Sequence, residues 1–390
     1  MDVKEIKNNI YYYGSSDPDR QYFDQLIPLP NGTSYNSYLV VGSEKTALID
    51  TVYPPQIDEF LEKLRKNGIK KIDYVIANHG EQDHSGALPE LIKMYPDIKI
   101  VTNKTCKEFL MELLLIDEDK FIVVQDNEEL SLGGKTLKFI MAPWVHWPDT
   151  MFTYVKEDGI LFSCDFFGSH LADETLYVED EKRVYDAAKR YYAEIMMPFV
   201  RIFKKYFAVI DELDIKMICA SHGPIYQNPS FIINAYKDWA KENSADKTVI
   251  IHVSMYGSTN IMLDYVTQKL QQNGVEVCVY DVMNCDLGNF AMDLIDATGV
   301  IIATPMVLGG PHPAVVSYTY IVNALRPQIK YVGIMGSYNW GGFMEKKIKN
   351  LLEDMRNIEF IKPLLIKGHP KQKDYPQIDE FVSEILKQYN

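Results

Sequence analysis

The sequence predicts two α/β domains in one chain of 390 residues. The length exceeds what one ordinary hydrophobic core fills. Short β-rich apolar runs, with a few helical patterns between them, occupy the first 240 residues, and regular alternation of strand, loop and helix follows the polar segment 240–247. We therefore expect a domain of two sheets with outer helices over 1–246 and a doubly wound parallel sheet over 247–390.

Each predicted element rests on a local pattern. In the first domain, apolar runs predict strands within 36–42, 46–52, 73–80, 98–103, 135–143, 159–166 and 216–223. Helical spacing of apolar residues predicts helices over 57–68 and 86–96. In the second domain, the helix 260–274 follows the first of five buried strands, which we expect at 248–254, 275–282, 299–305, 330–336 and 358–368.

Composition limits the classes of function. Hydrophobic residues make up 47% of the chain, and no apolar stretch approaches the roughly 18 to 20 residues of a membrane span. The first residues lack the apolar core of a signal peptide, so we expect a cytoplasmic protein. A net charge of −14 disfavours nucleic-acid and membrane partners. The five cysteines include no C-x-x-C pair and predict buried thiols, not disulfides or a zinc knuckle.

The stretch NHGEQDHSG (78–86) gathers metal-binding side chains at the end of a predicted strand. It contains His79, Glu81, Asp83 and His84. In extended backbone, alternate residues share a face, so positions 79, 81 and 83 can point together. One short loop could therefore supply ligands to two metal ions.

Further ligand-type residues follow the ends of later strands. His146 lies just past the strand at 135–143, and His222 lies at the end of the strand at 216–223. Asp165 ends the strand at 159–166, and His170 comes five residues later. A single histidine is more often a satisfied polar residue than a ligand, but several at strand ends beside three carboxylates predict a metal site. We expect His170 behind the ligands, since its sequence neighbours are small or apolar.

Three loops of the second domain predict a binding site for a phosphate and a flat ring. The first strand runs into a Ser/Thr-rich turn at 254–259 and then a helix, which offers hydroxyls and backbone N–H groups to a phosphate. Such a turn can also serve only as a helix cap. The loops 303–313 and 336–342 bring glycines and aromatic residues to the same sheet edge, as a flat ring requires.

These motifs resemble those of a known family. The H-x-[EH]-x-D-H pattern at 79–84, with a single His, Asp and His at later strand ends, looks like the metallo-β-lactamase fold. Glu81 stands where hydrolases of that fold usually carry histidine. The segments HWPDTM (146–151), SCDFFGSH (163–170) and SHGPIY (221–226) are similar to those of flavodiiron proteins. The resemblance implies a metallo-β-lactamase-like αβ/βα sandwich followed by a flavodoxin-like domain.

The resemblance also implies two irons and an FMN. His79, Glu81 and His146 would hold one iron, Asp83, His84 and His222 the other, and Asp165 would bridge them. In some members the residue matching His84 lies off the metal, so His84 is either a ligand or a neighbour. A mixed imidazole and carboxylate set without thiolate suits iron. Asp50 is a candidate to orient the imidazoles.

The flavodoxin-like loops would place the FMN phosphate on 254–259 and its ring between 304–310 and 336–342. The residues expected to contact FMN are Ser254, Met255, Tyr256, Gly257, Ser258, Thr259, Thr304, Pro305, Met306, Val307, Leu308, Gly309, Ser337, Tyr338, Asn339, Trp340 and Gly341.

The implied activity is reduction of O2 to water, of NO to N2O, or of both, with electrons passed through FMN. Since no rubredoxin-like C-x-x-C module is present, an external rubredoxin, a reductase or a reduced deazaflavin coenzyme would be the donor. Flavodiiron proteins form head-to-tail homodimers in which one chain's flavin meets the other chain's irons, and we expect the same here.

Three questions stay open at this point. The chain could instead be a metallo-hydrolase of the β-lactamase fold fused to a flavodoxin-like domain, or an electron carrier whose metal site is vestigial. The lysine-rich segments at 182–190 and 345–350 are expected to be solvated charged faces, with docking of an acidic carrier as the alternative.

Overall fold

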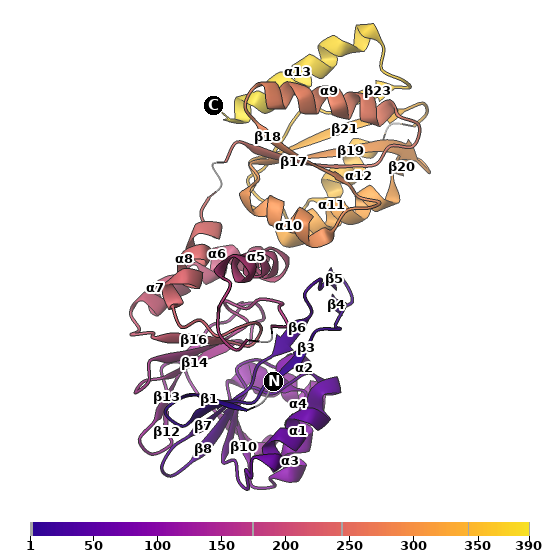
Figure 1. The fold of residues 1–390 in the computed structure, drawn as a ribbon. Helices are drawn as coiled ribbons and strands as arrows, with labels where there is room; N and C mark the ends of the chain where they lie inside the picture. Colours follow the sequence, from indigo (N-terminus) through magenta and orange to yellow (C-terminus); the bar gives the residue numbers. More distant parts are fainter. Residues whose placement is uncertain (1–2, 174, 243–244, 342, 390) are drawn as a thin grey trace. The chain divides into compact units, whose positions relative to one another are not determined.

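The computed structural model describes residues 3–173, 175–242, 245–341 and 343–389, and it divides into two compact units (Figure 1). The first unit extends to Ala240 and the second begins at Lys241, while the short segment Ala193–Pro198 groups with the second unit. Across the described ranges, no helix is both long and apolar enough to cross a membrane.

The first unit contains two large sheets. The seven-stranded sheet has the order β1-β2-β7-β8-β9-β10-β11, and the five-stranded sheet has the order β12-β13-β14-β15-β16. The strands of the first are β1 (Lys4–Lys7), β2 (Ile10–Tyr12), β7 (Tyr38–Val41), β8 (Thr46–Ile49), β9 (Tyr74–Ile76), β10 (Lys99–Thr102) and β11 (Phe121–Val123). Those of the second are β12 (Glu129–Ser131), β13 (Thr136–Met141), β14 (Met151–Val155), β15 (Ile160–Cys164) and β16 (Met217–Ala220).

The two sheets share one apolar core, and helices cover their outer faces. Val40, Ile76, Phe139 and Phe162 belong to a single cluster formed by both sheets. A second cluster packs the other face of the seven-stranded sheet against three helices: α1 (Ile57–Lys66), α3 (Leu88–Met94) and α4 (Lys104–Leu114). Four helices lie beside the five-stranded sheet: α5 (Glu181–Tyr191), α6 (Val200–Phe203), α7 (Tyr206–Asp211) and α8 (Pro229–Trp239) (Figure 1). This arrangement is the predicted αβ/βα sandwich.

The second unit is a parallel sheet between two layers of helices. Its order is β18-β17-β19-β21-β22, and all these neighbours pair in parallel. Its strands are β17 (Lys247–His252), β18 (Glu276–Asp281), β19 (Gly299–Val307), β21 (Tyr331–Tyr338), β22 (Glu359–Phe360) and β23 (Leu364–Lys367), with β20 (Gly310–Pro311) beside β19. The helices α9 (Ser258–Gln272) and α13 (Tyr375–Leu386) cover one face. The other face carries α10 (Leu287–Asp296), α11 (Pro313–Leu325) and α12 (Met344–Leu351) (Figure 1).

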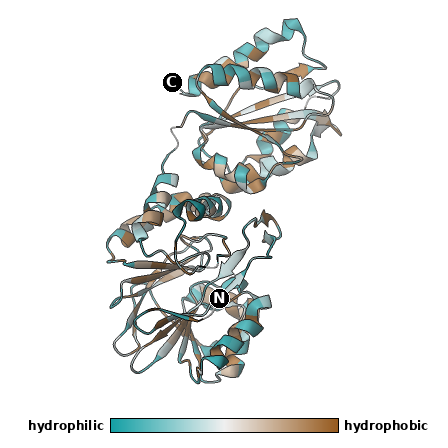
Figure 2. Ribbon diagram, in the orientation of Figure 1, coloured by the Kyte–Doolittle hydropathy of each residue, from teal (hydrophilic) through white to brown (hydrophobic). Residues whose placement is uncertain are grey.

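Hydropathy follows these layers. Figure 2 shows mostly apolar strands and helices that carry both apolar and hydrophilic residues. In β13 the burial pattern alternates along most of the strand, as expected where one face meets the core. Each helix can then place its apolar side against a sheet and its polar side toward solvent.

The structure corrects one predicted strand and adds shorter ones. The run predicted as a single strand at 358–368 forms two strands, β22 and β23, which both pair in parallel with β21. Pro363 lies between them and has no N–H to donate, so it cannot continue a hydrogen-bonded ladder. Two small two-stranded sheets were not predicted: β3 (Ser15–Asp17) with β6 (Thr33–Tyr35), and β4 (Tyr22–Phe23) with β5 (Ile27–Pro28). Their strands are too short to show a periodic pattern.

Hydrogen bonds of the Asn36 side chain join the segment before β7 to the end of β16 and the loop that follows it. Its Nδ2 donates to the carbonyl oxygens of Ala220 and Gly223, both at 2.8 Å, and its Oδ1 accepts from the Tyr12 hydroxyl at 3.2 Å. The side chain is 3% exposed, so water cannot readily replace these bonds. His222 lies between the two bonded carbonyls, and its position therefore depends on Asn36.

We predict that Asn36→Ala destabilises the first unit. The buried Gly223 carbonyl would lose its Asn36 donor, and the Ala220 carbonyl would keep only the longer bond from the Tyr38 hydroxyl at 3.3 Å. An unsatisfied buried group costs about 1–3 kcal/mol. Differential scanning calorimetry should show the unfolding midpoint of this unit falling by several degrees. Asn67→Ala, at the exposed end of α1, is the matched control and should change the midpoint little. Equal midpoints for both variants would contradict the role assigned to Asn36.

Candidate metal centre and cofactor site

The loop after β9 supplies four of the predicted ligands. It passes through His79 and Glu81 into the one-turn helix α2 (Gln82–Ser85), which carries Asp83 and His84. Glu81 is the N-terminal flanking residue of α2 and is extended, so the chain turns at this residue from loop to helix. This turn sends two pairs of side chains in different directions from one short segment.

The five-stranded sheet supplies the other three. His146 lies in the β13–β14 connection, Asp165 directly follows β15, and His222 comes two residues after β16. Because β15 is parallel to β16 and antiparallel to β14, all three residues lie at the same edge of the sheet.

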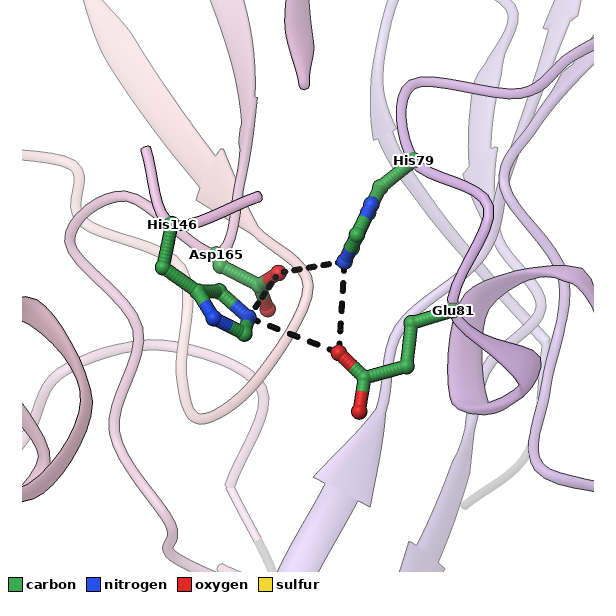
Figure 3. A group of neighbouring side chains, drawn as sticks. All are labelled: His79, Glu81, His146 and Asp165. Atoms are coloured by element: carbon green, nitrogen blue, oxygen red, sulfur yellow. Dashed lines mark hydrogen bonds and ion pairs between the residues drawn. The ribbon is translucent and has the colours of Figure 1, made fainter. Parts of the chain in front are cut away.

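Four side chains form the first group: His79, Glu81, His146 and Asp165 (Figure 3). One nitrogen or oxygen of each lies within 4.8 Å of the others. Glu81 Oε2 is 3.2 Å from His79 Nε2 and 3.4 Å from His146 Nε2. Asp165 Oδ2 completes the group at 3.4 Å from His146 Nε2. Two imidazoles and two carboxylates thus converge on one point.

Asp83, His84 and His222 form the second group, again within 4.8 Å. Asp83 Oδ1 is 3.2 Å from His84 Nε2, and Asp83 Oδ2 is 3.2 Å from His222 Nε2. The other oxygen of Asp165, Oδ1, reaches this group at 3.1 Å from His84 and 3.4 Å from His222. Asp165 therefore presents one oxygen to each group, and His84 lies inside the second group.

The two groups create a strongly negative buried environment. Burial alone would lower the pKa of a histidine, yet facing Asp165 and Glu81 raise the pKa of His146 to about 9. In the same way, Asp165 and Asp83 outweigh burial and raise the pKa of His222 to about 10. Burial opposes ionisation of Glu81, but His146 and His79 hold its pKa well below the usual value. The site therefore favours positive charge, whether as protons or as metal ions.

Unpaired polar atoms show that the second group suits a cation. Within the described residues, both Asp83 oxygens and the Nε2 atoms of His84 and His222 are buried and make no hydrogen bond. Such atoms are costly to bury, and one metal ion would satisfy all of them. The neighbouring Cys164 is a poor competitor, because burial and then Asp165 raise the pKa of its thiol well above the usual value.

Asp149 orients the imidazole of His79 by contacting Nδ1, the ring nitrogen that faces away from the first group. His79 Nδ1 is 3.1 Å from both Asp149 carboxylate oxygens, and the Gly80 N–H donates to Asp149 Oδ2 at 2.7 Å. With Nδ1 as the donor, His79 Nε2 keeps a lone pair toward the group. The sequence prediction missed Asp149, although this residue lies in the segment HWPDTM (146–151), three residues after His146.

The second group is held by backbone and by Tyr191. His222 Nδ1 is 2.6 Å from the Ser34 carbonyl oxygen, which orients the ring in the same manner. The Tyr191 hydroxyl, on α5, donates to Asp165 Oδ1 at 3.0 Å. Tyr191 was also missed, because nothing in its sequence surroundings is typical of a site.

His170 and Asp50 lie outside both groups. His170 Nδ1 is 2.9 Å from Thr33 Oγ1, and its ring centre is 5.1 Å from that of His222. Asp50 accepts hydrogen bonds from N and Nδ2 of Asn78, both at 2.8 Å. Among the described residues its carboxylate fixes the start of the β9 loop and is not hydrogen-bonded to an imidazole. Burial raises the pKa of Asp50 to about 6, and the charge of His84 opposes that rise, so its role in orienting an imidazole stays a prediction.

In the second unit, the three predicted loops surround a cavity of about 250 Å³. It is lined by Ser254, Met255, Tyr256, Ser258, Thr259, Pro305, Met306, Ser337, Tyr338, Asn339, Trp340 and Gly368. Six residues of the predicted set belong to these loops but do not line the cavity: Gly257, Thr304, Val307, Leu308, Gly309 and Gly341. The sequence prediction missed Gly368, which follows β23 at the same sheet edge.

One end of this cavity is suited to an anion. Gly257 has a φ of 84° and turns the chain from β17 into α9. The N–H groups of Ser258 and Thr259, at the start of this helix, have no carbonyl partner within the helix. Ser254 Oγ is buried without a hydrogen-bond partner among the described residues. Trp340 is 64% exposed and could flank a flat ring.

The chain is similar to a family of known proteins along most of its length. Residues 33–223 match the family described as ODP family beta lactamase. A coenzyme F420H(2) oxidase of Methanothermobacter marburgensis is 34% identical over 367 residues, 90% of each chain, and a nitric oxide reductase of Moorella thermoacetica is 34% identical over 357 residues, 89% of each. The structure of rubredoxin oxygen:oxidoreductase from Desulfovibrio gigas aligns with a TM-score of 0.94 at 28% identity, over 99% of this chain and 98% of that one.

The chain belongs to the flavodiiron protein family. Membership confirms the predicted fold class, a metallo-β-lactamase-like sandwich with a flavodoxin-like sheet. This flavodiiron protein is therefore an oxidoreductase, and the alternative of a metallo-hydrolase is not favoured.

We predict that Asp149→Ala weakens metal binding at the His79 side. Loss of a carboxylate behind a metal-binding imidazole typically lowers metal affinity about 10–100-fold. Anaerobic titration of the apoprotein with ferrous iron should show one weakened site per chain, and Asp149→Asn should be intermediate because its oxygen still accepts from Nδ1. Asp117→Asn, on the exposed surface, is the control. Two unchanged sites in Asp149→Ala would disprove the role of Asp149.

Proposed function

We propose that this flavodiiron protein reduces O2 to water, NO to N2O, or both, at a non-haem diiron centre that FMN supplies with electrons. The observation that carries the proposal is the placement of Asp165, whose two oxygens face two separate groups of ligand-type side chains. His79, Glu81 and His146 would hold one iron, and Asp83, His84 and His222 would hold the other. Asp165 would bridge them.

The donor set fits iron. It combines imidazoles with carboxylates and includes no ionised thiolate, since the pKa of Cys164 is raised. When bound, two irons and one FMN would together store four electrons and act as Lewis acids toward the diatomic substrate. Reduction of O2 to two waters needs four electrons and four protons, and reduction of two NO to N2O and water needs two of each.

The protein's own residues would position these groups and shield them. Asp149 and the Ser34 carbonyl fix the rings of His79 and His222. The Tyr191 hydroxyl holds Asp165 through a hydrogen bond to Oδ1. The Trp147 ring lies 4.9 Å from the His79 ring and excludes water from that side.

FMN would occupy the cavity of the second unit, with its phosphate at Ser254–Thr259 and its ring near Trp340. The exposed apolar side chains Tyr256, Leu308 and Trp340 support burial of this rim in a head-to-tail homodimer. In that dimer the flavin of one chain would serve the irons of the other. The external donor would be a rubredoxin, a reductase or a reduced deazaflavin coenzyme, and a cytoplasmic location stays a prediction.

The first experiment is anaerobic. Protein with measured iron and FMN content is reduced fully with dithionite, freed of excess reductant, and mixed separately with O2 and NO. We expect rapid flavin reoxidation, with four electrons consumed per O2 and no peroxide, or N2O from NO. Asp165→Ala should abolish this turnover and retain FMN. If neither gas reoxidises iron-loaded wild-type protein, the proposed function fails.

We predict that Ser254→Asp weakens FMN binding about 100-fold or more, which corresponds to about 2.7 kcal/mol. A carboxylate at this position would repel the phosphate, whereas Ser254→Ala would remove only one hydrogen bond, equivalent to about tenfold. Fluorescence titration of the FMN-free protein measures both. Ser317→Asp, exposed on α11, is the control. FMN affinity unchanged in Ser254→Asp would exclude this loop as the phosphate site.

A further inference from the structure

Two consecutive tyrosines connect the candidate metal centre with α8. The Tyr191 hydroxyl donates to Asp165 Oδ1 at 3.0 Å, and the Tyr192 ring centre lies 5.3 Å from that of Trp239 on α8. Both tyrosines are 1% exposed. The helix α5 ends at Tyr191, and a π-helical turn, a rare element often found at functional sites, begins at Tyr192. The two neighbouring phenol rings therefore contact Asp165 on one side and α8 on the other.

Trp239 extends this line of rings to a tyrosine near the surface. Its indole Nε1 donates to the Tyr185 hydroxyl oxygen at 3.0 Å, and the two ring centres are 5.1 Å apart. Trp239 is 5% exposed, whereas Tyr185 is only partly buried. Tyr191, Tyr192, Trp239 and Tyr185 are thus joined by contact or by adjacency in the chain and lead from Asp165 to the surface. We call these four residues the aromatic relay.

The surface end of the relay lies beside a cavity of about 230 Å³. Phe231 lines this cavity, and its ring centre is 6.5 Å from that of Tyr185. Glu181, another lining residue, lies one helical turn before Tyr185 on α5, so both side chains share a face of the helix. The other lining residues are uncharged: Val178, Tyr226, Gln227 and Asn228. The cavity is therefore suited to a small neutral or cationic molecule close to Tyr185.

The residue types along this path have a chemical property that packing does not require. Phenylalanine fills much of the adjoining core, where Phe166 contacts Phe203 at 5.4 Å between ring centres. Each ring of the relay is instead a phenol or an indole, the two aromatic groups that give up an electron most readily. Hydrogen bonds also lie at both ends of the relay, one to Asp165 and one to Tyr185. Such a line of oxidisable rings can pass electrons between a buried metal centre and the surface.

We infer that the aromatic relay carries oxidising equivalents from the metal centre to a small thiol at the surface when O2 meets an incompletely reduced centre. This inference rests on the proposed function. Full reduction of O2 takes two electrons from the irons and two from reduced FMN. If FMN is oxidised, two electrons are missing, and the relay supplies them from outside. In balance, O2, two iron electrons, two protons and two thiols give two waters and one disulfide.

Each transfer moves one electron inward along the relay. Tyr191 gives an electron to the centre while its phenol proton shifts along the hydrogen bond to Asp165 Oδ1. Trp239, which can lose an electron and keep its proton, then reduces Tyr191, and the proton returns to the phenol oxygen. Tyr185 reduces Trp239 and releases its proton to solvent, since it is partly exposed. A thiol in the adjacent cavity restores Tyr185 by giving up a hydrogen atom, so no radical persists beside the metal ligands.

The test uses iron- and FMN-loaded protein that has received two electrons per chain from dithionite, with the flavin absorbance confirming that FMN is still oxidised. This protein is mixed with O2 and freeze-quenched, and electron paramagnetic resonance detects organic radicals. Deuterated tyrosine or tryptophan, incorporated separately, identifies the radical and distinguishes it from a flavin radical. Cysteamine is the thiol probe, because its amine complements Glu181.

The variants are Tyr185→Phe and Trp239→Phe, and Tyr236→Phe is the matched control. The Tyr236 ring contacts Tyr192 and Trp239 at 5.2 and 5.4 Å between ring centres. Its hydroxyl is buried and has no hydrogen-bond partner among the described residues, so its removal leaves those ring contacts in place. Tyr185→Phe changes a partly exposed side chain and keeps the test valid if Trp239→Phe lowers the stability of the protein.

We expect wild-type protein to form a radical that responds to deuterated tyrosine and that cysteamine removes, with formation of cystamine. In Tyr185→Phe the radical should respond to deuterated tryptophan instead, and cysteamine should no longer remove it. Trp239→Phe should lose the tryptophan signal and cystamine formation, and mass spectrometry after repeated cycles should show oxidised side chains beside the metal ligands. Tyr236→Phe should match wild type, and all four proteins should reoxidise at equal rates when fully reduced.

Four results would overturn the inference. They are the absence of an organic radical in wild-type protein that consumes O2, a radical that also forms in iron-free protein, equal removal of the radical by cysteamine in Tyr185→Phe, and the same losses in Tyr236→Phe. The last would show that the variants act through packing. Failure of the proposed function is a separate result, since fully reduced, iron-loaded wild-type protein would then be reoxidised by neither O2 nor NO.

Discussion

The charge balance at Asp165 is the constraint on which the first unit depends. Glu81, Asp83 and Asp165 are brought together at low exposure, and three such carboxylates repel one another unless positive charge lies between them. The raised pKa values of His146 and His222 show how strongly this environment attracts a cation. Two metal ions would satisfy the same groups without the imidazole protons.

The fold brings these groups together by joining two sheet edges. The β9 loop comes from the seven-stranded sheet, while His146, Asp165 and His222 come from the five-stranded sheet. Neither sheet alone could build both groups, because Asp165 must reach His84 across the sandwich. The shared core of the two sheets and the bonds of Asn36 therefore hold the candidate metal ligands at their spacing as well as stabilising the fold.

The sequence predicted most of this arrangement where the local pattern is strong. Ligand-type residues at strand ends, such as His79 and His222, were found because strands of four or more apolar residues precede or flank them. Asp149 and Tyr191 were not found. Their roles depend on contacts with His79, 70 residues away in the sequence, and with Asp165, 26 residues away. Asp50 was assigned to an imidazole because its type and position suited that role, but its two oxygens accept from the backbone N–H and the side-chain amide of Asn78. Hydrogen-bond partners of this kind are fixed by tertiary packing.

The two sites differ in how ligands can reach them. His79 is 0% and Asp165 1% exposed, so an ion reaches these atoms only during folding or when the covering loops part. Around the second cavity, Tyr256 is 89% and Trp340 64% exposed, so a flavin can enter the folded unit from solvent. A buried centre would keep its metals and exclude water from the reacting atoms, whereas the cavity of the second unit would let FMN bind after the unit has folded. Separation of the sites into two units lets each meet its own requirement.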